Sequence, residues 1–136
     1  MTAPPIHVVA GALFDAAGRV LIAQRPPGKH MAGGWEFPGG KLAKDEARIA
    51  GLIRELREEL DIEVETAQPI IDYMHHYADR SVCLDLWLIT SYRGTPRSAE
   101  GQAIKWVLPR ELESADLLPA DRPMIEPLCK LAAKRG

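Results

Sequence analysis

The chain has few of the features that mark secreted, membrane-bound or nucleic-acid-binding proteins. It has two cysteines, Cys83 and Cys129, too few and too far apart for a disulfide scaffold or a zinc site. No apolar run reaches transmembrane length, and the N-terminus shows no basic start followed by an apolar signal core. The formal net charge of -2 gives no electrostatic basis for binding a nucleic-acid polymer or an anionic membrane. We therefore expect a cytoplasmic protein.

What the sequence does contain is the composition of an ordinary globular protein. It is 46% hydrophobic and 26% charged, without repeats or low-complexity segments. Its 136 residues predict one domain over residues 1–136 with a single core. A polyanionic substrate would need a local basic patch or bridging metal ions. We expect a monomer or a weak homodimer.

A helix is predicted from Ile49 to about residue 62. Ile49, Ile53, Leu56 and Leu60 recur at spacings of four, three and four, which places them on one apolar stripe.

Three carboxylates, Glu55, Glu58 and Glu59, gather on a different face of this helix. Like charges three and four residues apart destabilise a bare helix. The face is therefore either freely solvated, as acidic runs usually are, or built to hold a cation. Hard oxygen ligands of this kind suit Mg²⁺ or Mn²⁺.

The residues around these carboxylates resemble the Nudix box, GX5EX7REUXEEXGU, where U is aliphatic. The matching residues are Gly40, Glu46, Arg54, Glu55, Leu56, Glu58, Glu59 and Ile62. Asp61 departs from the pattern, because the box has Gly there. That Gly would form a left-handed C-cap, a conformation that Asp also tolerates, so we expect a small stability cost and an intact metal site.

Strands are predicted for residues 6–14, 19–25, 62–64, 69–77 and 82–92, from β-branched and apolar runs bounded by turn residues. Asp85 interrupts the last of these runs and needs a partner or an exposed edge. A short helix starts within residues 108–112. A loop over residues 117–123 precedes the last helix, with Asp121 as a candidate N-cap.

The resemblance extends to the MutT-type branch of the Nudix family. It rests on residues 30–32, 35–41 (WEFPGGK), the loop at Glu100 and residues 119–123. It implies the α/β Nudix fold, an α/β/α sandwich with a mixed sheet. It also implies metal-assisted attack of water on a nucleoside triphosphate, giving a nucleoside monophosphate and pyrophosphate.

The family pattern assigns roles to individual residues. The metal ligands, Mg²⁺ with Mn²⁺ as a substitute, are Glu55, Glu58, Glu59, Glu100 and the Gly39 carbonyl. Glu55, Glu58 and Glu59 are the catalytic residues, with Glu55 preferred for orienting or deprotonating water. Glu46 pairs with Arg54 in a structural role, beside Gly40.

The substrate-binding residues predicted by this resemblance are Arg25, His30, Phe37, Tyr77, Arg80 and Asp121. Arg25 is either an exposed charge or a phosphate ligand, for which Arg is suited. Asp121 stands where MutT enzymes specific for 8-oxo-dGTP carry Asn. An ionised Asp only accepts hydrogen bonds, whereas a protonated one also donates. The favoured substrate is 8-oxo-dGTP. The alternative substrate is CTP or a modified pyrimidine triphosphate, and the alternative function is a non-catalytic domain that senses nucleotides. Asp121 could instead act only as a helix cap.

Overall fold

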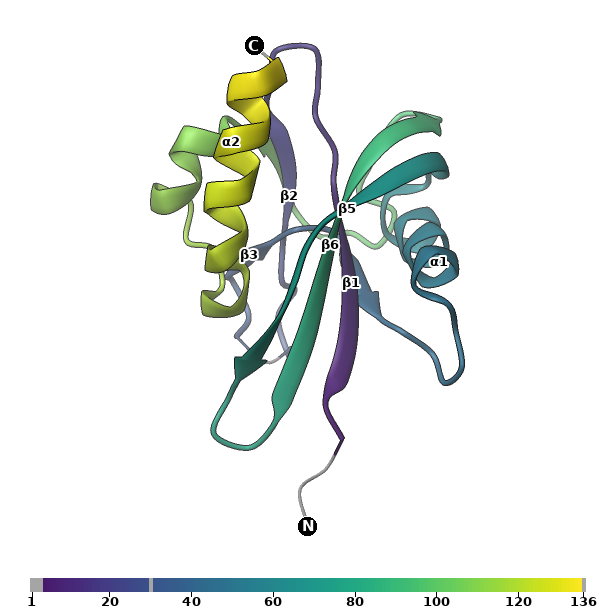
Figure 1. Cartoon of the computed structure of the whole chain (residues 1–136), viewed down its shortest axis with the longest axis vertical. Helices are drawn as coiled ribbons and strands as arrows, with labels where there is room; N and C mark the ends of the chain where they lie inside the picture. The colour runs from purple at the N-terminus through teal and green to yellow at the C-terminus, as the bar shows by residue number, and fades with distance from the viewer. Residues whose placement is uncertain (1–3, 30, 136) are drawn as a thin grey trace.

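The strands of this chain lie between two α-helices (Figure 1). The structure is a computed structural model that describes residues 4–29 and 31–135. Its elements are β1 (Ile6–Ala12), β2 (Val20–Gln24), β3 (Trp35–Glu36), β4 (Gly39–Lys41), α1 (Arg48–Leu60), β5 (Glu63–His76), β6 (Ser81–Arg93), β7 (Ile104–Val107), the 3₁₀ helices η1 (Pro109–Ser114) and η2 (Pro119–Met124), and α2 (Ile125–Arg135). In the described ranges no helix is long and apolar enough to cross a membrane.

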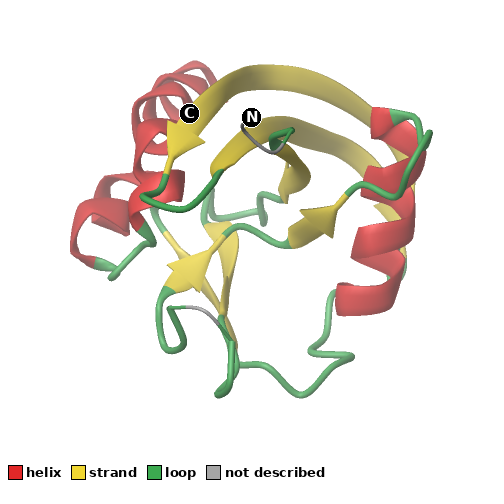
Figure 2. Ribbon diagram, turned by 90° about the horizontal axis from the view of Figure 1, so that it is seen from below, coloured by secondary structure: helices red, strands yellow, loops and turns green. Residues whose placement is uncertain are grey.

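Parallel and antiparallel pairing occur in the same sheet. The larger sheet has the order β4-β1-β6-β5 and the smaller one β3-β2-β7. β1 runs parallel to β6, with Val9 opposite Asp85, and antiparallel to β4, with Ala10 opposite Gly39. The helices lie on opposite sides of the strands (Figure 2). The predicted α/β/α sandwich with a mixed sheet is confirmed.

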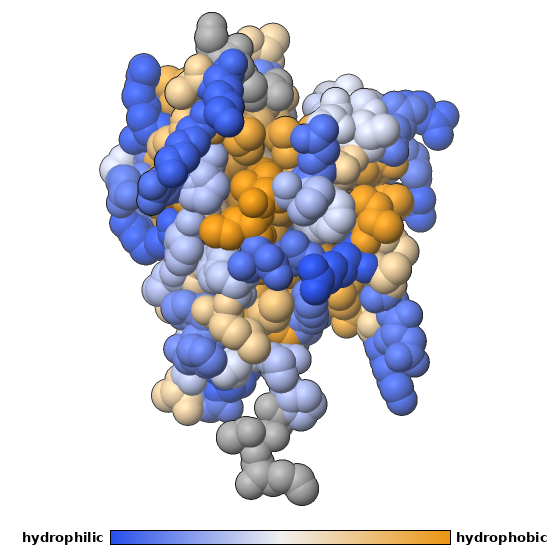
Figure 3. Space-filling view, viewed as in Figure 1, coloured by the Kyte–Doolittle hydropathy of each residue, from blue (hydrophilic) through white to orange (hydrophobic). Residues whose placement is uncertain are grey.

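The side chains of β1 divide the interior into two cores, because successive residues of a strand point to opposite faces. Val9 packs with Leu52 and Leu56 of α1. Ala10 belongs to the second core, under α2, η1 and η2. On the face shown in Figure 3, apolar residues gather in a band across the middle, between largely polar regions.

Helix α1 packs closely on the sheet. Leu52, Leu56 and Leu60 are fully buried, and a Cβ atom at Gly11 would lie only 2.8 Å from the Leu56 Cδ1 atom. Ile49, in contrast, is 39% exposed, so the buried part of the predicted apolar stripe begins after it. It lies in the first turn of the helix, at the end of the stripe, and Leu52 takes the buried position one turn later.

The C-terminus of α1 has the predicted left-handed residue. Asp61 has φ 58° and ψ 42°, and its N–H donates to the Arg57 carbonyl. The Arg97 guanidinium lies 2.9 Å from the Asp61 carboxylate. Asp therefore replaces the glycine of the motif without changing how the helix ends.

Several predicted boundaries differ from the structure. β5 is one continuous strand where two were predicted, since bulges near Thr66 and Pro69 let the pairing with β6 continue. Residues 119–123, predicted as part of a loop, lie in η2.

Asp85 is buried on the face of β6 that looks toward α1, and its carboxylate lies 3.4 Å from the Arg48 guanidinium.

Candidate active site

The three glutamates of α1 have different environments. Glu58 is exposed, Glu55 is half-buried, and Glu59 is only 8% exposed. Glu59 follows Leu56 by three residues and so borders the buried stripe of the helix. The carboxylates therefore do not form one solvated face; they extend from the surface into the protein.

Arg54 connects these carboxylates to Glu46. Its Nε donates to Glu46 Oε2 at 2.8 Å, and another guanidinium nitrogen donates to Glu55 Oε1 at 2.9 Å. The predicted contact between Glu46 and Arg54 is therefore present. Hydrogen bonding to Arg54 lowers the pKa of the Glu46 carboxyl to about 2. The planar guanidinium suits this forked arrangement.

Glu59 reaches the strand that carries the glycine pair. The Gly39 N–H donates to Glu59 Oε2 at 2.9 Å. Burial, together with the charges of Glu36, Glu100 and Glu55, raises the pKa of the Glu59 carboxyl to about 8, although the hydrogen bond from the Gly39 N–H lowers it. The carboxylates are therefore close enough to repel one another.

Divalent cations fit the chemistry of this donor set. All the ligands are hard oxygens, and a cation would relieve the repulsion that raises the pKa of both Glu55 and Glu59. Within the described residues, no three His, Cys, Asp or Glu side chains form a ready-made cluster. The reason is visible in the contacts, because Glu55 and Glu58 face Arg54 and Glu59 faces the Gly39 N–H. Metal binding requires these carboxylates to exchange hydrogen bonds for the ion.

The two glycines of β4 leave space for different neighbours. A Cβ atom at Gly39 (φ 156°) would lie 2.0 Å from the Val9 carbonyl oxygen of β1. A Cβ atom at Gly40 would instead lie 2.3 Å from Glu55 Oε2. Gly39 allows the strands to pair, and Gly40 makes room for a proposed catalytic carboxylate.

Glu100 lies in a loop that is attached to the end of α1. The Ala99 N–H donates to the Glu59 carbonyl and the Arg97 N–H to the Leu60 carbonyl, each at 3.0 Å. The charge of Glu100 raises the pKa of Glu55 and of Glu59. The structure thus brings this distant residue to the α1 carboxylates, as predicted; its role as a metal ligand stays a prediction.

Asp121 is buried in the second part of the site, at 5% exposure. Its Oδ2 accepts a hydrogen bond from the Phe37 N–H at 3.0 Å. Burial, with a smaller contribution from the charge of Glu36, raises the pKa of its carboxyl to about 7. The expectation that Asp121 is an N-cap is wrong, because it lies inside η2 and its carboxylate bonds to a strand segment 84 residues away.

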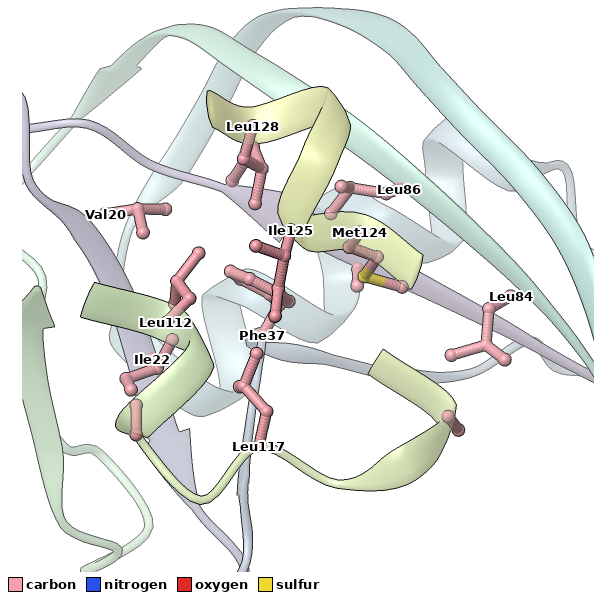
Figure 4. Packing of buried hydrophobic residues seen from close by; sticks show 14 of the residues in the cluster. Val20, Ile22, Phe37, Leu84, Leu86, Leu112, Leu117, Met124, Ile125 and Leu128 are labelled. Atoms are coloured by element: carbon pink, nitrogen blue, oxygen red, sulfur yellow. The ribbon is translucent and has the colours of Figure 1, made fainter. Parts of the chain in front are cut away.

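Phe37 contributes its backbone N–H to this part of the site. Its ring is 3% exposed and belongs to the core, where Figure 4 shows it among Leu112, Leu117 and Ile125. A direct contact between this ring and a substrate is therefore not supported. Substrate binding by Phe37 stays a prediction, and only its main chain could fulfil it.

Three further predicted substrate residues lie near Asp121. The charges of Asp121, Arg25 and Arg80 all act on the pKa of the Tyr77 hydroxyl, which burial raises. The Tyr77 N–H donates to the Arg80 carbonyl at 2.7 Å and closes the β5–β6 turn. Among the described residues, the buried Arg80 Nε has no hydrogen-bond partner. His30 lies outside the described residues.

Glu36 connects the two parts of the site and was missed by the sequence analysis. Its Oε2 accepts a hydrogen bond from Arg25 Nε at 2.9 Å. Its charge raises the pKa of both Glu59 and Asp121. The available signal was a carboxylate in the WEFPGG segment, between two aromatic residues.

A separate groove lies elsewhere on the molecule. It has a volume of about 770 Å³ and runs between the turn after Phe14, Leu108 and the end of α2 at Ala132. Its lining contains none of the glutamates or substrate-binding residues considered above. Chemistry, rather than cavity size, therefore locates the candidate active site.

The fold is that of MutT-like proteins. The solution structure of the Escherichia coli ORF135 protein is 38% identical, covers 96% of this chain and 92% of its own, and superposes with a TM-score of 0.83. A MutT structure from work on Aliivibrio salmonicida and Vibrio cholerae is 32% identical, covers 94% and 99%, and has a TM-score of 0.80.

Sequence comparison identifies the family. The family model described as NUDIX domain matches residues 9–127. The CTP pyrophosphohydrolase of E. coli K12 is 39% identical over 96% of each chain. The 8-oxo-dGTP diphosphatase of the same strain is 30% identical over 93% of this chain and 98% of its own. The chain belongs to the Nudix family, and the predictions of family and of a Nudix hydrolase are confirmed.

Proposed function

We propose that this chain is a Mg²⁺-dependent nucleoside triphosphate pyrophosphohydrolase that releases a nucleoside monophosphate and pyrophosphate. The observation that carries the proposal is the convergence of Glu55, Glu59 and Glu100, whose charges act on one another beside Gly39. An idle, nucleotide-sensing domain has no need for such a set. Residues 1–136 are proposed to form one catalytic domain.

The proposed metal ligands are Glu55, Glu58, Glu59, Glu100 and the Gly39 carbonyl. A bound Mg²⁺, or Mn²⁺ in its place, would lower the pKa of the attacking water and neutralise charge on the phosphates. Glu55 orients the water and accepts its proton, and burial, which raises the pKa of this carboxyl, favours proton acceptance. Arg54 orients Glu55 through their 2.9 Å hydrogen bond.

The nucleobase of the substrate is bound in the second part of the site, at Asp121. There Asp121 and the Phe37 main chain face Arg25, Tyr77 and Arg80, with the arginines proposed to contact phosphate or base. Because the pKa of Asp121 is near 7, this carboxyl both donates and accepts hydrogen bonds around neutral pH. That character suits an oxidised guanine, and 8-oxo-dGTP is the substrate we favour.

A second candidate substrate is CTP or a modified pyrimidine triphosphate. It is supported by the relative named CTP pyrophosphohydrolase and by the donor–acceptor edge of cytosine, which a protonated Asp121 matches. A kcat/KM panel with 8-oxo-dGTP, dGTP, CTP and 5-methyl-dCTP separates the two. Preference for CTP over 8-oxo-dGTP would reject the favoured substrate.

Pyrophosphate release in the presence of Mg²⁺ tests the reaction itself. We expect Glu58→Gln to lower turnover by about 100-fold or more, because charge stabilisation at phosphate is lost. Glu126→Gln on α2 is the matched control; its side chain is exposed and pairs with Lys130 on the surface, where such pairs contribute little. Turnover of Glu58→Gln within about twofold of wild type would show that the assigned metal ligands are wrong.

A further inference from the structure

Gln102 is a buried amide in the loop that carries Glu100. It is 9% exposed, although its neighbours Gly101 and Ala103 are both exposed. Its Nε2 donates to the Glu59 carbonyl at 3.2 Å, and its Oε1 accepts the Glu100 N–H at 3.2 Å. One side chain therefore joins the backbone of Glu59 to the backbone of Glu100.

The loop uses hydrogen-bonding groups that the end of a helix leaves free. The last carbonyls of an α-helix have no partner within the helix. Here the Glu59 carbonyl accepts both the Ala99 N–H and the Gln102 amide. The Ser98 hydroxyl lies 2.9 Å from Gln102 Oε1 and holds the amide from the other side.

The chemistry of the contact requires an amide. A carboxylate at position 102 would accept the Glu100 N–H but would have nothing to donate to the Glu59 carbonyl. An apolar side chain would make neither bond, so the Glu100 N–H would lose this acceptor and the Glu59 carbonyl would keep only the Ala99 N–H. Only a group that donates and accepts satisfies both backbones.

We propose that Gln102 is a positioning residue that holds Glu100 in place beside the metal-binding carboxylates of α1. The inference rests on the proposed function, because it takes Glu100 as a metal ligand. Residues that orient metal ligands typically contribute 10–100-fold to metal affinity or activity. Gln102 therefore affects metal binding without touching the metal.

The test is Mn²⁺ binding to the substrate-free protein, measured by calorimetry and by electron paramagnetic resonance. We expect Gln102→Ala to weaken binding about 10-fold or more. Gln68→Ala is the matched control, because it makes the same change at an exposed position on β5 and should leave binding unchanged. Thermal unfolding of each variant shows whether the protein is folded at the temperature of the binding experiment.

A double-mutant cycle with Glu100→Gln shows whether Gln102 acts through Glu100. If it does, Gln102→Ala should weaken binding far less in the Glu100→Gln background than in wild type, because contributions made through one group do not add. Additive losses, or an unchanged affinity in Gln102→Ala or in Glu100→Gln alone, would overturn the inference. A lower unfolding temperature with unchanged affinity would show a merely structural role.

Two further results complete the design. If Gln102→Ala does not fold, Ser98→Ala removes the hydroxyl that bonds the Gln102 amide and carbonyl oxygens. It should weaken Mn²⁺ binding by a smaller factor, measured at a temperature where the variant is folded. Unchanged binding would count against the inference. Failure of the proposed function has a different signature, namely no Mn²⁺ binding and no pyrophosphate release by wild type. Wild-type binding and activity with an unaffected Gln102→Ala variant would reject the inference alone.

Discussion

Substituting alanine for each of the two glycines of β4 should affect different properties, namely stability at Gly39 and activity at Gly40. In Gly39→Ala the new methyl group meets backbone, 2.0 Å from the Val9 carbonyl oxygen and 2.7 Å from Ala10 Cα. Neither atom can move without separating β4 from β1. In Gly40→Ala the three nearest atoms all belong to the Glu55 carboxyl group, at 2.3–2.7 Å, and that group can rotate away.

The expected magnitudes follow from these neighbours. Overpacking against backbone costs about 1–3 kcal/mol or more, and the positive φ of Gly39 adds about 1–3 kcal/mol for a residue with a side chain. We expect Gly39→Ala to lose about 3–5 kcal/mol, or about 10–20 °C in Tm for a chain of this size. Gly40→Ala should stay within about 1 kcal/mol of wild type, because the strained contact is relieved by one side chain.

Gly40→Ala should nevertheless lose activity, measured at a temperature where the variant is folded. Moving Glu55 to a normal contact distance displaces its carboxylate by about 1 Å, and a misplacement of that size costs about 100-fold in rate. Thermal unfolding by circular dichroism and a pyrophosphate-release assay measure the two effects separately. The reasoning would be refuted by a Gly40→Ala variant that keeps wild-type kcat/KM, or by one that loses as much Tm as Gly39→Ala.

Three other perturbations test other parts of the structure. Asp121→Asn should remove a pH dependence of stability. Burial raises the pKa of the Asp121 carboxyl from 3.8 to about 7. The contribution of this carboxyl to the stability of wild type is therefore complete below pH 4 and is lost as the pH rises through 7. The free energy of unfolding of the variant relative to wild type, measured in urea, should therefore increase by up to about 4 kcal/mol between pH 4 and 8, and parallel pH curves would contradict this. Tyr73→Phe removes the hydrogen bond that the hydroxyl donates to the Ala120 carbonyl, next to Asp121. We expect the free energy of unfolding to fall by about 1 kcal/mol and KM to rise by a larger factor than any fall in kcat. An unchanged KM would contradict the placement of Asp121 in the substrate site. Leu56→Ala should lose about 2–5 kcal/mol, because Leu56 is fully buried against Gly11; a smaller loss in a denaturant titration would mean that α1 is less tightly packed than the structure shows.

Local sequence patterns predicted the parts of the site that lie on one helix. The resemblance to the Nudix box implied a contact between Arg54 of α1 and Glu46, which lies just before the helix, and the structure shows two hydrogen bonds between them at 2.8 and 2.9 Å. The conformation of Asp61 followed equally from its place at the end of the helix. Such features depend on helical geometry over a few turns, which the order of residues largely determines.

Local sequence patterns did not predict the contacts between segments that are distant in the sequence. Asp121 looked like a helix cap because its neighbours in sequence suggested one, yet its carboxylate bonds to the Phe37 N–H. Phe37 looked like a binding residue, and its ring is buried in the core. Glu36 has importance only because β3 places it near both Glu59 and Asp121.

The parallel pairing of β1 and β6 has a consequence for the order of folding. Ile6 lies opposite Val82, 76 residues further along the chain, and closing so long a loop is slow compared with forming a hairpin. The β5–β6 hairpin, joined by a short turn at Arg80, should form first, and β1 should dock onto it afterwards. In pulse-labelling hydrogen exchange, amides of β6 that face β5 should gain protection before those of β1. Helix α1, which packs on Val9 and Gly11, would then acquire its catalytic geometry only in the last step of folding.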